Sequence, residues 1–178
     1  MNNKREVEMQ YKKYVDEHIA NVKLVWSKFR ETFKYYGGEN TREIDENIED
    51  HDQSKYGDLE FDGYRQNFFP EKGVEKDKEA FNYAWNSHQK SNPHHWQFWV
   101  MYKPKGSVAL KMPLNYIIEM LCDLTAMSIK FNDPSVSVWY NDNKENMLLH
   151  PDTARTIDIN LPSFDKVLED IRKGSTKE

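Results

Sequence analysis

The sequence has almost no cysteine and no long apolar run. Its single cysteine, Cys122, excludes an internal disulfide and any zinc motif built on several cysteines. One free thiol is compatible with a reducing compartment. No stretch approaches the roughly 20 apolar residues of a membrane-spanning helix, and no apolar run follows the first five residues. We therefore expect a cytoplasmic protein that does not enter a membrane.

Basic residues are too few for a nucleic-acid-binding surface. The 25 lysines and arginines are outnumbered by 30 aspartates and glutamates, which gives a formal net charge of -5. Proteins that bind a phosphate backbone cluster their lysines and arginines instead. We expect no strong nucleic-acid binding, although a local basic pocket remains compatible with this charge. The 178 residues suffice for one domain whose core can enclose a polar site.

Apolar residues in the first half of the chain are spaced as in helices. They recur every three or four positions from Tyr11 to Phe33, which predicts an amphipathic helix that ends at Gly37-Gly38. A second helix is predicted to begin at Thr41, its N-cap, and to end before Gly57. A short helix capped by Asp58 and closed by Pro70, a polar linker over 71–78 and a helix around 81–88 are predicted to follow.

The second half is predicted to contain one hairpin among helices. Segments 98–102 and 107–112 flank Lys103-Pro104-Lys105-Gly106, a pattern typical of a small β-hairpin. Pro113 begins a strongly apolar helix that ends at Asp133-Pro134, and two or three shorter helices are predicted around 136–146, 151–160 and 163–173. The predicted fold class is mainly α, as a single domain over 1–178 with its core at about 8–173 and a frayed tail at 174–178.

Four residues on predicted inward faces could share a metal ion. They are His18, the adjacent pair His51-Asp52, and Asp123. Imidazole and carboxylate together suit divalent zinc, manganese, iron or cobalt. Asp123 interrupts the most apolar helix, where an unpaired carboxylate is costly to bury, so a cation or strong donor must be near. Individually, His18 could be a hydrogen-bonded core histidine and Asp52 a surface carboxylate, whereas jointly the four favour a metal site.

Three more histidines could supply a second metal. His88 lies on an inward face, and His94 and His95 follow a turn that Asn92-Pro93 imposes. Of these two we favour His94, although the sequence offers no real means of choosing. The alternative is that His94, His95 and Trp96 form a packed aromatic corner without a metal.

Two charged residues close to these ligands have candidate catalytic roles. Lys55 lies one helical turn beyond Asp52, where its ammonium could reach a metal-bound phosphate; the alternative is a surface lysine. Glu119 lies one turn before Asp123 and could orient a histidine or act as a general base. The alternative is that Glu119 or Asp123 simply pairs with a lysine, for which the candidates are Lys23, Lys111 and Lys130.

The order H…HD…D of these residues resembles the ligand order of the HD metal-dependent phosphohydrolase superfamily. The strings HDQSKYGDLEF, AFNYAWNSHQKSNPHHWQFW, MPLNYIIEMLCDLTAMS and WYNDNK also resemble an uncharacterised family of small HD-like proteins of bacteria and phages, over most of the chain from His18 to about Thr153. The resemblance implies an HD-like helical bundle and a site for one or two divalent metals, drawn from Mn, Fe, Zn, Co or Mg. One departure is that HDIGK-type strings read HDQSK here, without the glycine.

These residues favour a metal-dependent phosphohydrolase acting on a nucleotide or another small phosphoester. Asp52, Lys55 and Glu119 would be its catalytic residues, and Trp85, Trp96, Trp99 or Tyr102 could stack on a base or pack in the core. The first alternative is a di-iron oxygenase of HD type, because the resemblance extends to scaffolds that activate oxygen with nearly the same ligands. The second is a non-catalytic binding protein with a structural metal site.

Overall fold

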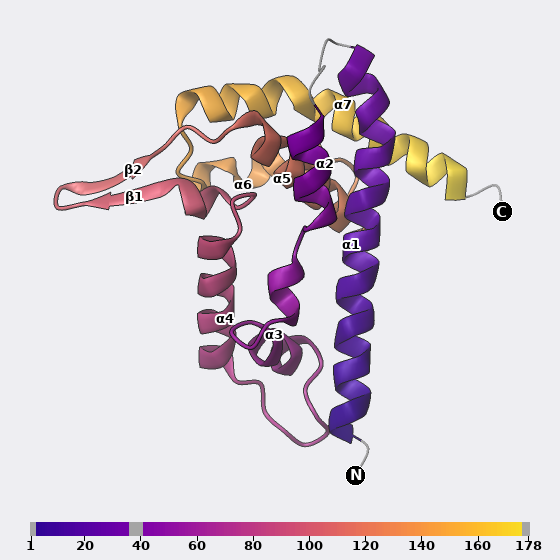
Figure 1. Ribbon diagram of the computed structural model, residues 1–178, viewed down its shortest axis with the longest axis vertical. Coiled ribbons are helices and arrows are strands. Elements are labelled where there is room, and N and C mark those ends of the chain that lie inside the picture. Colours follow the sequence, from indigo (N-terminus) through magenta and orange to yellow (C-terminus); the bar gives the residue numbers. More distant parts are fainter. Residues whose placement is uncertain (1–2, 36–40, 176–178) are drawn as a thin grey trace.

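Two long helices frame the molecule in a computed structural model, which describes residues 3–35 and 41–175 (Figure 1). The helix α1 (Asn3–Tyr35) runs the length of one side, and α7 (Pro151–Ser175) packs against its C-terminal half. The mainly α fold predicted from the sequence is confirmed. The remaining helices are α2 (Arg42–Glu49), α3 (Phe61–Phe68), α4 (Lys78–Ser91), α5 (Leu114–Phe131) and α6 (Val136–Asn143), with short 3-10 turns at Gln53–Tyr56, Trp96–Trp99 and Lys144–Asn146.

The predicted β-hairpin is present and projects from the helical body (Figure 1). Strands β1 (Val100–Lys103) and β2 (Gly106–Ala109) are antiparallel, with Met101 opposite Val108. Gly106 has a φ of 121°, a conformation that a side chain would disfavour, so a glycine at this turn position fits the tight connection.

The core consists of two apolar clusters that meet along α1. The larger cluster joins the C-terminal half of α1 to α2, α5, α6 and α7, through buried residues such as Val22, Leu121 and Phe164. The smaller cluster joins the N-terminal half of α1 to α3 and α4, through residues such as Val15 and Tyr64. His18 lies on the same stripe of α1 between Val15 and Val22, so α1 places it where the two clusters meet.

Helix α5 crosses the larger cluster and is the most apolar helix of the molecule, as its sequence indicates. Pro113 precedes its first turn in an extended conformation, and Asn132 ends it with a left-handed φ of 56°. No helix in the described part of the chain combines the length and apolar character needed to cross a membrane.

The structure corrects the second predicted helix. That helix was expected to run to Gly57, but α2 ends at Glu49, and a turn and a 3-10 segment follow. Thr41 precedes α2, as predicted, without capping it by a side-chain hydrogen bond; its hydroxyl donates to Asp45 instead (3.0 Å). The interruption falls at His51 and Asp52.

The predicted short helix also begins later than expected. Asp58 was expected to cap it, yet α3 begins at Phe61 and the preceding residue is Glu60, which is buried. Leu59 is 80% exposed and contributes nothing to the core. In contrast, α4 is capped by Asp77, whose side chain accepts a hydrogen bond from the Ala80 amide (2.9 Å).

The chain ends differ from the prediction as well. The predicted helices over 151–160 and 163–173 are one continuous helix, α7, which passes through Pro162 and includes Gly174. Pro162 faces outward, while Leu161 and Phe164 beside it are buried in the larger cluster, so packing outweighs the lost hydrogen bond. At the other end, α1 buries Val7, close to the predicted start of the core at about residue 8. The predicted helix stop at residues 37–38 lies outside the described residues.

Candidate metal centre

The backbone reverses at the His-Asp pair. Asp52 has a φ of 59° and a ψ of 15°, in the left-handed region that few residues other than glycine adopt. This conformation separates α2 from the 3-10 turn that follows and sets both side chains inward, so that His51 and Asp52 are each only 1% exposed. A strained backbone at a buried polar pair is typical of a functional site.

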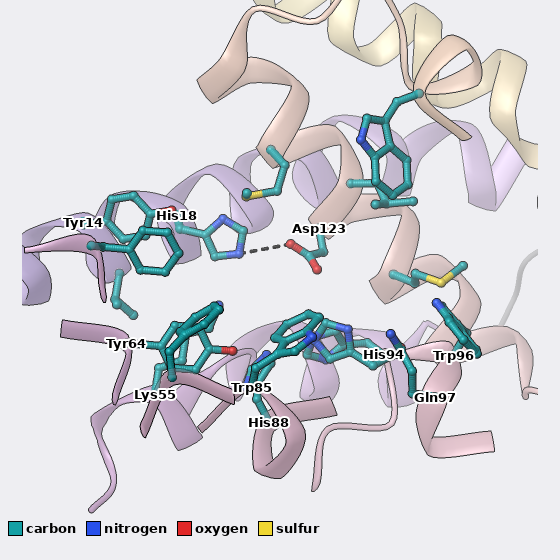
Figure 2. Close-up of a pocket in the computed structure, with 18 of the residues that line it drawn as sticks. Tyr14, His18, Lys55, Tyr64, Trp85, His88, His94, Trp96, Gln97 and Asp123 are labelled. Atoms are coloured by element: carbon teal, nitrogen blue, oxygen red, sulfur yellow. Dashed lines mark ion pairs between the residues drawn. The ribbon is translucent and has the colours of Figure 1, made fainter. Parts of the chain in front are cut away.

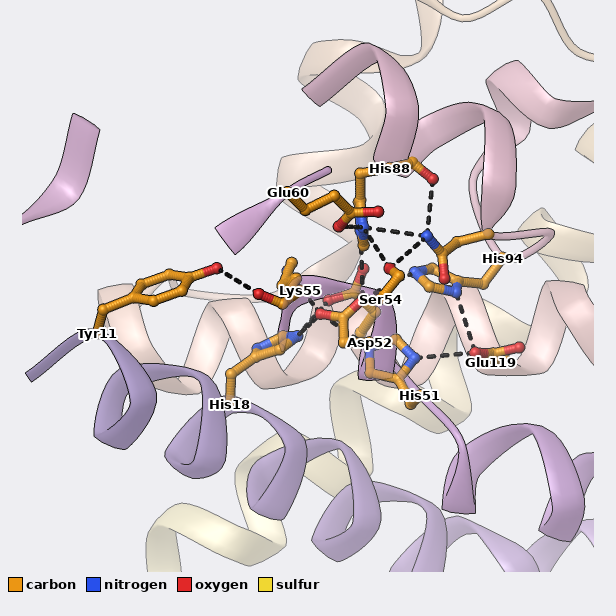
Figure 3. A network of polar contacts seen from close by, with 12 residues as sticks. Tyr11, His18, His51, Asp52, Ser54, Lys55, Glu60, His88, His94 and Glu119 are labelled. Atoms are coloured by element: carbon orange, nitrogen blue, oxygen red, sulfur yellow. Dashed lines mark hydrogen bonds and ion pairs between the residues drawn. The ribbon is translucent and has the colours of Figure 1, made fainter. Parts of the chain in front are cut away.

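The two carboxylate oxygens of Asp52 face two different sets of histidines (Figure 3). Its Oδ2 lies 3.3 Å from Nε2 of His18 and 3.6 Å from Nε2 of His51. Its Oδ1 lies 3.2 Å from Nε2 of His88 and 3.6 Å from Nε2 of His94. One carboxylate thus stands between two pairs of imidazole nitrogens, which come from α1, the α2 turn, α4 and the segment after α4.

Asp123 of α5 completes the first of these sets. Its Oδ1 lies 3.1 Å from Nε2 of His18. Burial by itself raises the pKa of Asp123, but the neighbouring His18 outweighs burial and holds the pKa well below its usual range. The sequence required a cation or strong donor near Asp123, and His18 is that neighbour. Lys23 and Lys111 instead pair with Glu49 and Asp152, and Lys130 lies over the ring of Tyr14.

Two buried glutamates contact the other ring nitrogens of three of these histidines. Oε1 of Glu119 lies 2.9 Å from Nδ1 of His51 and 3.0 Å from Nδ1 of His94. Oε2 of Glu60 lies 2.8 Å from Nδ1 of His88. A carboxylate that accepts from Nδ1–H leaves Nε2 with its lone pair, which is the tautomer that binds metals through Nε2. The three Nε2 atoms therefore face Asp52 as potential ligands.

The inward atoms fit a divalent cation because they lack hydrogen-bond partners in the described part of the chain. Nε2 of His18, His51 and His94 and Oδ1 of Asp52 are buried and make no well-aligned hydrogen bond. Leaving such groups unsatisfied is costly, and a cation would satisfy them together. Ligand atoms lie within 4.8 Å of one another in the groups His18–His51–Asp123 and His51–Asp52–His94.

His95 lies at the edge of the same arrangement. Its ring is 4.7 Å from that of His88 and 4.3 Å from that of His94, and the three form another compact ligand group. Both candidates after the Asn92-Pro93 turn therefore reach the site, but of the two it is His94 that faces Asp52 and Glu119. The sixth histidine, His150, lies elsewhere and accepts a hydrogen bond from the Asp152 amide.

The charges of the site are strongly coupled. Nζ of Lys55 lies 2.5 Å from Oδ2 of Asp52. Burial alone raises the pKa of Asp52, but Lys55 and His51 outweigh burial and lower the pKa well below its ordinary value. Burial lowers the pKa of His94 to about 4, so this imidazole is neutral near pH 7 and its nitrogen is free to bind a metal.

A cavity of about 410 Å³ opens beside these residues (Figure 2). His18, His88, His94 and Asp123 belong to its lining, with His18 and Asp123 on one side of the cavity and His88 and His94 on the other. Trp85 and Trp96, two of the four aromatic residues considered for stacking on a substrate, also line it. The other two do not: Trp99 packs against the larger core cluster, and Tyr102 is 72% exposed on the hairpin.

Several residues at the site were not predicted from the sequence. Glu60 is buried beside His88, and the one signal in the sequence that could have found it is its place next to the apolar Phe61 in the string GDLEF. Asn92 donates to Oγ of Ser54 (2.9 Å) and to the carbonyl of His88 (2.8 Å), which fixes the end of α4. Tyr64 lines the cavity, and its buried hydroxyl has no hydrogen-bond partner among the described residues.

Comparison with known proteins gives one match. The model of a family of unknown function (DUF5662) matches residues 7–161, which is most of the chain. The protein therefore belongs to this family. No curated protein and no solved structure matches the chain.

Proposed function

We propose that this protein is a metal-dependent phosphohydrolase that acts on a small phosphoester, with nucleotides among the candidates. The observation that carries the proposal is the position of Asp52 beside a cavity. Its two oxygens face separate sets of histidine nitrogens, three of which have no hydrogen-bond partner among the described residues. His18, His51, Asp52 and Asp123 would hold one divalent ion. His88 and His94, with His95 at the edge, would hold a second ion together with Asp52.

Divalent metals at such a site lower the pKa of a water molecule and neutralise phosphate oxygens. The protein residues supply orientation and charge. Glu60 and Glu119 fix the rings of three histidines, and among the described residues that line the cavity Lys55 offers the one ammonium. Burial lowers the pKa of Lys55, but the carboxylates of Asp52 and Asp123 outweigh burial and raise it, so this side chain remains a cation. A cation there is suited to an anionic substrate group.

The test combines metal analysis with a substrate screen. Protein purified without chelator or affinity tag should contain one or two equivalents of a divalent metal, and with manganese it should release phosphate or alcohol from at least one phosphomonoester or phosphodiester. Asp52→Ala and the isosteric Asp52→Asn should both lose metal and activity while retaining helical circular dichroism. Full metal content and turnover in either variant would exclude the proposed site.

An enzyme with two iron ions that uses oxygen is the second candidate. It is favoured by the apolar cavity, in which Lys55 is the only lysine among the described lining residues and arginine is absent. Many phosphate sites gather several basic groups, so a sparse set also suits a substrate without phosphate. Protein loaded with iron that consumes oxygen with a substrate, and that hydrolyses no phosphoester with any metal, would support this candidate over the first.

A further inference from the structure

The lining of the cavity has a polar part, which we call the metal side, and apolar walls. Lys55 and Asp123 lie with the histidines on the metal side, and Lys55 is the only lysine among the described lining residues. Asp52, Glu60 and Glu119 contact these histidines without lining the cavity. The other described lining residues are aromatic or aliphatic, apart from Gln97. They include Phe68, Phe81, Leu124, Met127, Trp139 and Met147.

The apolar walls consist of packed aromatic rings that the protein leaves partly exposed. The rings of Tyr14 and Phe68 stack with centroids 5.8 Å apart, and Tyr64 meets Phe81 edge to face at 5.5 Å. Nevertheless Phe68 remains 44% exposed and Trp85 37% exposed. Large apolar side chains that stay exposed in a concave site are a typical surface for an apolar ligand.

Charge balance limits the anion that the metal side can accept. Four carboxylates and one ammonium among the described residues leave a net charge of -3 there when the ligating histidines are neutral. Two divalent ions would convert this to a single positive charge, which one phosphate monoester, with about -1.5 to -2 near pH 7, already offsets. A second or third phosphate would extend along apolar walls, where an unpaired charge is costly to bury.

We propose that the site takes an ester of a single phosphate whose alcohol is a neutral aromatic or alkyl group, and that it disfavours polyphosphates. This inference rests on the proposed phosphohydrolase function and specifies its substrate class. The phosphate would lie on the metal side beside Lys55. The neutral body would lie against the apolar walls, at residues such as Trp85, Leu124 and Met127.

The inference can be tested by binding, independently of turnover. Alkylphosphonates from propyl to hexyl carry the same head group and resist hydrolysis, so calorimetry on manganese-loaded protein reports contacts of the tail alone. We expect the dissociation constant to fall about threefold for each added methylene, the order expected for burial of a CH₂ group. 5-Phosphonopentanoate, which ends in a carboxylate, should bind at least tenfold more weakly than hexylphosphonate.

A substitution in the lining of the cavity provides a second test of the inference. Met127→Lys places a cation at a half-buried lining position of α5, one turn from Asp123, and should reverse the preference in favour of 5-phosphonopentanoate. Ile159→Lys adds the same charge at a position that is 69% exposed and outside the cavity lining, and should retain the preference of the parent.

The outcomes separate the inference from the function on which it rests. Affinity that is independent of chain length, equal binding of the carboxylated ligand, no binding of hexylphosphonate or an unchanged preference in Met127→Lys would each overturn the inference. Those results would leave the phosphohydrolase proposal intact if phosphoesters are hydrolysed. Conversely, chain-length-dependent binding without hydrolysis of any phosphoester would support the ligand class and contradict the hydrolytic function.

Discussion

The ammonium of Lys55 lies 2.5 Å from Oδ2 of Asp52, the same oxygen that faces His18 and His51. The lysine thus neutralises the carboxylate from the cavity side, while histidine nitrogens approach it from the other sides. Because an ammonium has no lone pair, Lys55 can compete with a cation for Asp52 but cannot ligate it. A substitution of Lys55 can therefore impair use of the substrate without loss of metal binding, two properties that are usually lost together.

Replacement of this lysine should impair catalysis and preserve metal binding. In Lys55→Met the apolar stem remains and the charge is lost. We expect metal content at least equal to that of the parent, since nothing then competes for Oδ2 of Asp52. Catalytic efficiency on a phosphoester should fall tenfold or more, which is about 1.4 kcal/mol of transition-state stabilisation. Steady-state kinetics and elemental analysis on the same preparation give both quantities.

Lys111→Met is the matched control, because Lys111 is 65% exposed and pairs with Asp152 away from the cavity. It should behave as the parent protein in both measurements. Undiminished efficiency in Lys55→Met on a demonstrated substrate would show that Lys55 plays no part in holding phosphate.

The two buried glutamates should differ in which half of the site they support. Glu60→Gln removes the charge behind His88 alone, whereas Glu119→Gln removes the charge shared by His51 and His94. Loss of such supporting carboxylates typically weakens metal affinity 10–100-fold. We expect Glu60→Gln to weaken one of two metal equivalents and Glu119→Gln to weaken both. A metal titration monitored by calorimetry measures the affinity of each metal equivalent.

Glu49→Gln serves as the comparison, because the Glu49 side chain is 76% exposed and pairs with Lys23. Equal losses in Glu60→Gln and Glu119→Gln, or no loss in either, would show that the glutamates do not act on separate histidines.

Much of this arrangement could be predicted from residue order and periodicity. The stripe on α1 and the apolar run of α5 placed His18 and Asp123 inward because a helical repeat depends only on the local sequence. The hairpin likewise follows from turn residues around Gly106. These are short-range properties, and they account for the confirmed fold class and for the residues that the structure brings to one place.

What the sequence did not predict depends on contacts between distant segments. The break at Asp52 requires a left-handed backbone that a propensity argument disfavours, and only the surrounding histidines and Lys55 explain why it is tolerated. The role of Glu60 follows from α4, which carries His88 to it across 28 positions of the chain. From the local sequence, Pro162 predicts the end of a helix, yet packing on both sides of it maintains α7.

Because α3 packs closely against α4, we expect one methyl group added at Gly63 to lower the stability of the protein strongly. A Cβ at Gly63 would lie 2.6 Å from the carbonyl oxygen of Ala80 and 2.7 Å from Cβ of Ala84, one turn before His88. Gly63→Ala should therefore lower the free energy of unfolding by about 1–3 kcal/mol, as overpacking does. Urea denaturation measures this loss. Gly174→Ala, which meets nothing within 4 Å, should be neutral or slightly stabilising, and equal stability of the two variants would contradict the packing argument.

Metal binding should release protons because of the carboxylates around His18. Burial alone lowers the pKa of His18, but Asp123 and Asp52 outweigh burial and raise it to about 9 in the metal-free protein. A ligating imidazole must be neutral, so a metal displaces this proton below about pH 9, and apparent affinity should rise with pH up to that value. Calorimetry at pH 7 in buffers of different ionisation enthalpy should detect at least one proton released per protein.

The raised pKa of His18 gives the stability of the metal-free protein the opposite pH dependence, so that stability falls as pH rises. A pKa raised from 6.5 to about 9 by folding means that the folded state holds the proton more tightly than the unfolded state does. The contribution of His18 to stability is therefore fully present below about pH 6.5 and is lost as pH rises towards 9. Denaturation with chelator present should show this decline, and saturating metal should abolish it. Metal affinity that is constant between pH 6 and 8, with no proton release, would mean that His18 is not displaced from Asp123 and Asp52 by the metal.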